Sequence, residues 1–119
     1  EIEWLSRLAA LNFLKDNYRK ALMDSDFILS SRIVRAIIAF LNVNQEQFGI
    51  LVGCRKAKVS KILNEEQTIS KSQTLLALER LALELALPGS SRMILGLEQT
   101  IAELDQSIAK QINEMRFDR

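Results

Sequence analysis

Two short apolar segments that meet at Gly53 constrain the fold of this chain more than any other feature. In the second segment the apolar residues recur at spacings of three and four, which places them on one face of a helix. Each segment is too short to form a stable helix alone, so both must pack on each other and on neighbouring elements. Glycine tolerates the positive φ angle of a tight turn, so Gly53 predicts the turn. The apolar residues are Phe48, Ile50, Leu51 and Val52 before the turn, and Val59, Ile62 and Leu63 after it.

The first segment begins with an N-cap signal. Gln47 follows Asn44 by three residues, which is the spacing of a capping box at a helix N-terminus. We therefore expect the first short helix to begin directly after Asn44.

The second segment has an outer face with small and hydrogen-bonding residues at its centre and Lys56 and Lys58 at its edges. Residues 47–64 include several cations and no Asp or Glu, although the whole chain has a formal net charge of only +1. Such a face suits a helix that enters the major groove of DNA, with base edges at its centre and phosphates at its edges. A merely solvated face is the alternative, but it would more often mix charges of both signs. At about 100° per residue, the outward residues are Ala57, Ser60, Lys61 and Asn64.

The segment NQEQFGILVGCRKAKVSKIL, residues 44–63, resembles the helix-turn-helix of the phage-repressor family of DNA-binding proteins (lambda-repressor-like, Xre-type). As a domain, the resemblance covers roughly residues 31–85. It implies that Gln45 anchors a phosphate beside Asn44, and that bases are read from the second helix. The expected DNA-binding residues are Asn44, Gln45, Arg55, Lys56, Ala57, Lys58, Ser60, Lys61 and Asn64.

Four positions bear on the comparison with the family pattern. Gly49 stands where the family usually has alanine, because the two helices approach closely there. Arg55 stands where a Ser or Thr usually caps the second helix, so we expect a weaker or different cap. Glu65 and Glu66 replace the usual Asn-Gly, which argues against phosphate contacts from that loop.

Helices are also expected before and after this motif. Residues 1–23 predict a long helix with an apolar arc too wide for one partner; it packs either on its own domain or, as we slightly favour, partly on a second subunit. In residues 31–41 the apolar residues recur at the spacing of one helix face, which predicts a helix that packs on the core. Ser70 with Gln73 forms a second capping box, and it starts a helix that runs to about Leu87. Pro88-Gly89 ends that helix and marks a segment boundary.

Residues 91–116 follow a heptad pattern. Ile94, Ile101, Ile108 and Met115 occupy position a, and Leu97, Leu104 and Gln111 occupy position d. β-Branched residues at a with Leu at d favour two parallel strands, although Gly96 weakens the helix and Gln111 is polar. The alternative is a helix docked on the bundle or on residues 1–23. The expected dimerisation residues are Ile94, Leu97, Ile101, Leu104, Ile108, Ile112 and Met115.

Composition argues against several other functions. Cys54 is the one cysteine and the chain has no histidine, so a zinc site is excluded and the commonest general base is missing. No phosphate-binding glycine loop or nucleophile elbow is present. We expect no catalytic residue, metal or cofactor, and no enzyme. Without a long apolar run or a signal segment, we expect no membrane partner and a cytoplasmic, nucleoid-associated location.

These features predict an all-α, phage-repressor-type helix-turn-helix bundle with a long N-terminal helix and a C-terminal dimerisation helix. The expected divisions are 1–26, 27–88 and 89–119. We expect a homodimer that binds a pseudo-palindromic double-stranded DNA site and regulates transcription. One alternative is a DNA-binding antitoxin whose extra helix grips a toxin, and another is a helical adaptor that does not bind DNA.

Overall fold

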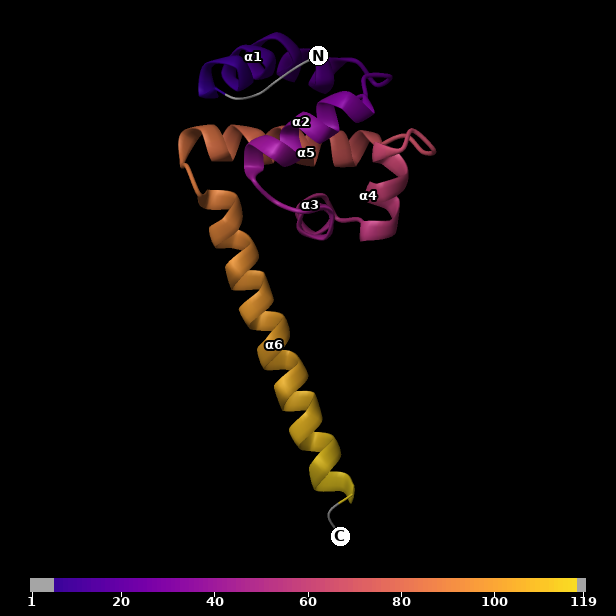
Figure 1. The fold of residues 1–119 in the computed structure, drawn as a ribbon, viewed down its shortest axis with the longest axis vertical. Helices are drawn as coiled ribbons and strands as arrows, with labels where there is room; N and C mark the ends of the chain where they lie inside the picture. The colour runs from indigo at the N-terminus through magenta and orange to yellow at the C-terminus, as the bar shows by residue number, and fades with distance from the viewer. Residues whose placement is uncertain (1–5, 118–119) are drawn as a thin grey trace.

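The computed structural model describes residues 6–117, apart from the side chains of 99, 116 and 117, and confirms that this part of the chain is all-α (Figure 1). The long helix expected over residues 1–23 begins at Arg7 instead, because Ser6 is its extended N-cap, and residues 1–5 lie outside the described residues. The helices are α1 (Arg7–Met23), α2 (Ser31–Leu41), α3 (Gln45–Val52), α4 (Lys56–Leu63), α5 (Lys71–Ala86) and α6 (Ser90–Phe117).

Side-chain caps define where four of these helices begin. Ser6 and Ser30 accept a hydrogen bond from the backbone three residues later, at α1 and α2. Asn44 and Ser70 each form a complete capping box, with Gln47 at α3 and Gln73 at α5. Both predicted capping boxes are therefore confirmed, and they satisfy backbone N–H groups that a helix start leaves unpaired.

The core lies among α2, α3, α4 and α5. The apolar face expected for residues 31–41 is confirmed in part, because Val34, Ile37 and Leu41 are fully buried and Ile33 and Ile38 are half-buried. The other helices complete the interior with Phe48, Leu51, Val52, Val59, Ile62, Ala77, Leu78 and Leu81.

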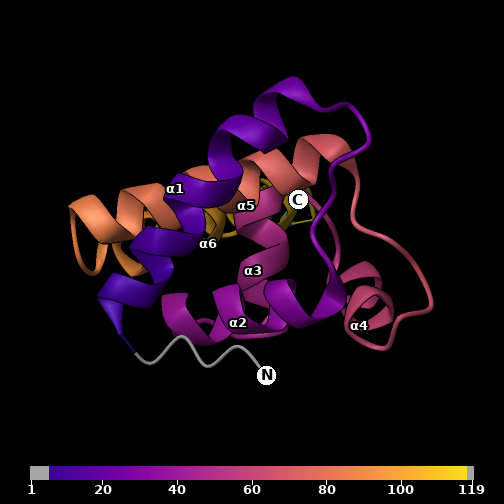
Figure 2. The same cartoon turned by 90° about the horizontal axis from the view of Figure 1, so that it is seen from above.

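α1 lies across α5 and is fastened to it at both ends (Figure 2). At one end the Arg7 guanidinium donates to the carbonyl of Leu85. At the other end the Lys71 ammonium donates to the carbonyls of Ala21, Asp24 (2.6 Å) and Phe27 (3.2 Å). A cation that caps the last carbonyls of a helix also interacts favourably with the helix dipole. Ala10 and Ala21 are buried, and Phe13, Leu14 and Tyr18 pack against the core, so one side of α1 is covered by its own chain. The other side stays exposed at Leu8, Leu11 and Leu22.

α6 leaves the bundle beside α5 and α3, on the side of α5 away from α1, and extends well beyond the other helices (Figure 1). The radius of gyration is 17.4 Å, compared with about 13.5 Å expected for a compact domain of this length. Leu95 is 3% exposed and is part of the core, whereas the described side chains from residue 96 onward are exposed. Among the described residues, α6 is therefore seated on the bundle only by its first turns.

Candidate nucleic-acid interface

The N-terminus of α3 is fixed by the capping box of Asn44 and Gln47. The carbonyl oxygen of the Asn44 side chain accepts a hydrogen bond from the Gln47 backbone at 2.8 Å, and the Gln47 side chain accepts one from the Asn44 backbone at 3.0 Å. The Asn44 side chain is therefore engaged in holding α3. Gln45 is the first residue of α3 and is half-buried, so it lies at the positive end of the helix dipole.

The turn between α3 and α4 folds back over Gly49. Gly53 has φ +76°, as predicted for a left-handed turn position, and the backbone N–H groups of Gly53 and Cys54 both donate to the Gly49 carbonyl. A Cβ on Gly49 would lie 2.5 Å from the carbonyl oxygen of Cys54. The expected close approach at Gly49 is thus real, but its nearest atom belongs to the turn itself.

α4 buries one side and exposes the other, as its spacing predicts. Val59, Ile62 and Leu63 are buried. Ala57, Lys61 and Asn64 are exposed and Ser60 is half-buried, so these four residues form the outer face. Arg55 and Lys56 are exposed beside it, and Lys58 is half-buried. Within the part of the chain that the structure describes, no cation of α4 or its N-cap donates a side-chain hydrogen bond or joins an ion pair. These cations are Arg55, Lys56, Lys58 and Lys61.

The start of α4 lacks a side-chain cap. Arg55 occupies the N-cap position in an extended conformation, and its side chain makes no capping hydrogen bond. This bears out the expectation of a weaker cap there. The first N–H groups of α4 therefore have no side-chain acceptor, and they point along the helix axis in the direction that favours an anion.

The end of α4 is held by two contacts that sequence reasoning missed. Nη2 of Arg35 donates to the carbonyl of Leu63 at 3.3 Å. Ser31, in the first turn of α2, donates its hydroxyl hydrogen to the Glu65 carboxylate at 3.1 Å. Glu65 itself has φ +61°, and its charge is turned toward the N-terminus of α2, where the helix dipole favours it. In the sequence, the only signs of these two contacts were the cation of Arg35 and the hydroxyl of Ser31, both in the segment predicted as a helix over residues 31–41.

A hollow lies between α4 and the N-terminal end of α5, and it brings Lys58 and Lys61 near Gln67 and Gln73. Cys54 also lines it. Burial raises the pKa of the Cys54 thiol, and the nearby Lys58 ammonium acts in the opposite direction. A thiol with a raised pKa is less reactive, and Cys54 is half-buried and packed against the core.

The expected dimerisation residues fall into two groups. Ile94 is half-buried where α6 meets the bundle. The neighbouring Leu95 is buried, although the heptad assignment places it outside positions a and d. The bundle therefore contacts a side of α6 other than the one that carries the a and d residues. The other six residues range from 52% to 75% exposed: Leu97, Ile101, Leu104, Ile108, Ile112 and Met115.

Other kinds of site find no support in the described residues. No group of three or more Cys, Asp or Glu side chains is placed to hold a metal ion, and no helix among the described residues is long and apolar enough to cross a membrane. Comparisons with protein-family models, curated proteins and solved structures found no match to this chain.

Proposed function

We propose that this protein is a sequence-specific double-stranded DNA-binding protein that acts as a homodimer and regulates transcription. In this proposal α3 and α4 form a helix-turn-helix of the phage-repressor type, and α4 is the recognition helix. The observation that carries the proposal is the outer face of α4, which has small and polar groups at its centre and, at its edges, cations that pair with no other described side chain. DNA offers matching groups, because base edges line the floor of the major groove and phosphates line both walls.

The proposed contacts divide into two kinds. Lys61, Ala57, Ser60 and Asn64 face the base edges, since they lie opposite the buried side of α4. Arg55, Lys56 and Lys58 contact phosphates, and the uncapped N–H groups at the start of α4 add donors for the same oxygens. Gln45 at the N-terminus of α3 anchors a further phosphate, with Asn44 holding the helix start in place.

Two copies are needed to bind a pseudo-palindrome, with one α4 helix in each half-site about one DNA turn apart. α6 offers enough apolar surface for this. Full burial of a Leu, Ile or Met side chain contributes roughly 1.5–3 kcal/mol, so covering the exposed half of six such side chains on each of two helices contributes on the order of 10 kcal/mol. Association costs roughly 4–15 kcal/mol in lost freedom of motion. The surface is therefore large enough for a dimer of modest affinity.

The proposal is tested by separating base contacts from phosphate contacts. Lys61→Ala is expected to weaken binding to the preferred site by about 1–3 kcal/mol while changing binding to random DNA much less. Lys58→Ala is expected to weaken both equally and to lower the slope of log K against log salt by about one unit. The measurement is fluorescence titration of each variant on both DNAs at several salt concentrations.

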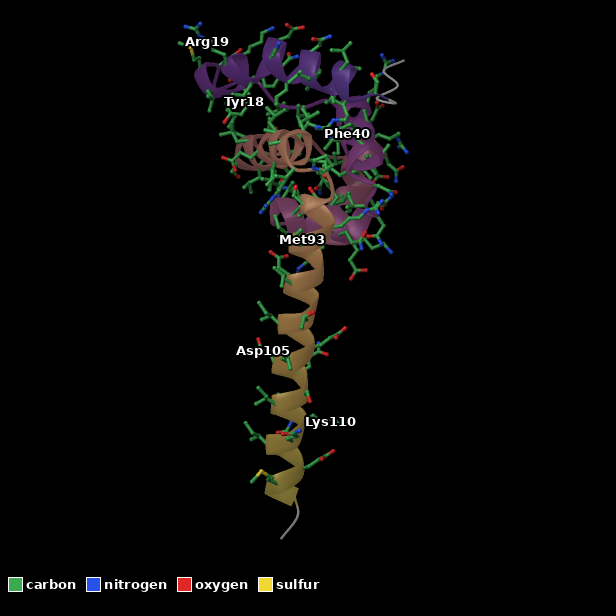
Figure 3. All side chains as sticks on the ribbon, turned by 90° about the vertical axis from the view of Figure 1, so that its left-hand side faces the viewer. Tyr18, Arg19, Phe40, Met93, Asp105 and Lys110 are labelled. Atoms are coloured by element: carbon green, nitrogen blue, oxygen red, sulfur yellow. The ribbon has the colours of Figure 1, made fainter. Side chains whose placement is uncertain are left out.

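Lys110→Ala is the matched control, because Lys110 is an exposed lysine far along α6 (Figure 3). It should leave both affinities unchanged. Equal losses on the two DNAs for Lys61→Ala would show that α4 does not read bases. Wild-type protein that selects no site from a random DNA library would remove the function itself.

A further inference from the structure

α6 carries an apolar stripe that no other described part of the chain covers. We propose that this stripe pairs in parallel, in register, with the same stripe of a second copy, so that both bundles sit at one end of the helix pair. The inference deepens the proposed homodimer, and it identifies the interface and its direction. The stripe consists of Met93, Leu97, Ile101, Leu104, Ile108, Ile112 and Met115.

The other terminal helix is a poorer interface. Exposed Leu8, Leu11 and Leu22 lie on one side of α1, but at about 100° per residue the exposed Lys15 and Arg19 fall on the same side. A mixed surface of this kind is ordinary for a solvated helix. The α6 stripe has no charged residue within it, and only Gln111 interrupts it.

The stripe is also turned away from the bundle. Ser90, Ser91 and Leu95 are the buried residues that seat α6 on the bundle, and all three lie in its first two turns. At about 100° per residue, Leu95 lies roughly 120–160° around the helix from Leu97 and Ile101. A second helix can therefore lie along the stripe from Met93 onward, without meeting the bundle of the first copy. Figure 3 shows Met93 where α6 emerges, and Asp105 and Lys110 where none of the other described helices is near.

The charges beside the stripe favour the parallel direction. In a parallel pair, a residue at g faces the residue at e of the next heptad on the other helix. Thr100 then faces Asp105 of the second copy, and Ser107 faces Ile112, so no like charges meet. An antiparallel pair with Leu97 opposite Met115 brings the two copies of Asp105 together, and like charges at such positions repel. β-Branched residues at a with Leu at d also favour two parallel strands.

The direction is tested by disulfide formation at the ends of the stripe, in protein with Cys54→Ser. Leu97→Cys and Met115→Cys are made separately. In the parallel pair each cysteine meets its own counterpart, and each variant should cross-link to itself under mild oxidation, because a disulfide needs Cα atoms about 4.4–6.8 Å apart. In the antiparallel pair the two copies of residue 97 lie about 27 Å apart. The expected result is a covalent dimer from each variant alone.

Three outcomes overturn the inference. Cross-linking only in a mixture of the two variants would show antiparallel pairing. Equal cross-linking of Lys110→Cys, which lies on the opposite side of α6 from the stripe, would show random collision. A wild-type protein that sediments as a monomer, or as a dimer unaffected by Ile101→Ala with Leu104→Ala, would remove the stripe as an interface; we expect this double variant to raise the dissociation constant by about a hundredfold or more.

The same samples separate this inference from the proposed function. Half-site DNA binding needs one bundle only, so it is measured on each protein beside its cross-linking. Dimers that cross-link as expected but bind no DNA would end the DNA-binding proposal and leave the α6 pairing intact. A protein that binds the half-site but never pairs would end the α6 pairing and leave the DNA-binding proposal intact.

Discussion

The bundle and α6 contain the same kinds of apolar residue at similar helical spacings, but the two regions differ in what covers them. In the bundle, Ile37, Phe48 and Leu78 are fully enclosed by helices of the same chain. In α6, Leu104 and Ile108 remain more than half exposed, since no other described helix lies beside them. The comparison teaches that periodicity identifies which face of a helix is apolar, and that it does not identify the surface that buries this face.

Removing one large side chain from each region is expected to give the largest difference between them. Phe48→Ala should destabilise the bundle by about 3–5 kcal/mol, because it opens a cavity at a fully enclosed site. Ile108 is more than half exposed, so Ile108→Ala opens no cavity inside the described part of one copy. It should therefore change only the association of α6 with a second copy. Thermal melts at several protein concentrations measure both effects.

The dependence of the melting temperature on protein concentration separates the stability of the bundle from the association of α6. Phe48→Ala should lower the melting temperature at every concentration, whereas Ile108→Ala should act only where the wild-type melting temperature itself depends on concentration. A large loss for Ile108→Ala in dilute monomer would mean that α6 folds back on its own bundle. That result would contradict the difference between the regions.

A second comparison uses one glycine from each region. Gly49→Ala should destabilise the protein by about 1–3 kcal/mol, because the new Cβ meets the Cys54 carbonyl oxygen and the backbone of the turn must shift. Gly96→Ala in α6 meets nothing within 4 Å and should stabilise its helix by about 0.5–1 kcal/mol. Chemical denaturation and helicity by circular dichroism report the two signs. If both variants stabilised, the turn would not be packed against α3.

The smallest expected effects come from side chains that bond to the backbone. Asn44→Ala removes the capping box of α3 and should cost about 1 kcal/mol. Thr100→Ala removes a bond from the Thr100 hydroxyl to the carbonyl of Gly96 (2.8 Å) in α6, and it should cost nothing, since such bonds do not strengthen a helix. Urea denaturation of the two variants resolves this difference. An unchanged stability for Asn44→Ala would mean that the capping box contributes nothing to α3.

Sequence reasoning predicted those parts of the fold and candidate site that depend on near neighbours. Both capping boxes, the turn at Gly53 and the limits of α2 involve residues a few positions apart, so their spacing is readable along the chain. The buried and outer faces of α4 follow in the same way from helical geometry. The missing side-chain cap at Arg55 was also predictable, because arginine has no acceptor to offer the first N–H groups.

The helices from α2 to α5, the capping boxes of α3 and α5 and the positively charged face of α4 were therefore readable from the sequence, because local hydrogen bonds and periodicity act over one or two turns. Only the tertiary structure decided that Leu95 joins the core, that Arg35 holds the end of α4, and that Ser31 turns Glu65 toward α2. The last two contacts join residues 28 and 34 positions apart. They exist because packing brings particular helix ends together, and no local spacing encodes which ends will meet.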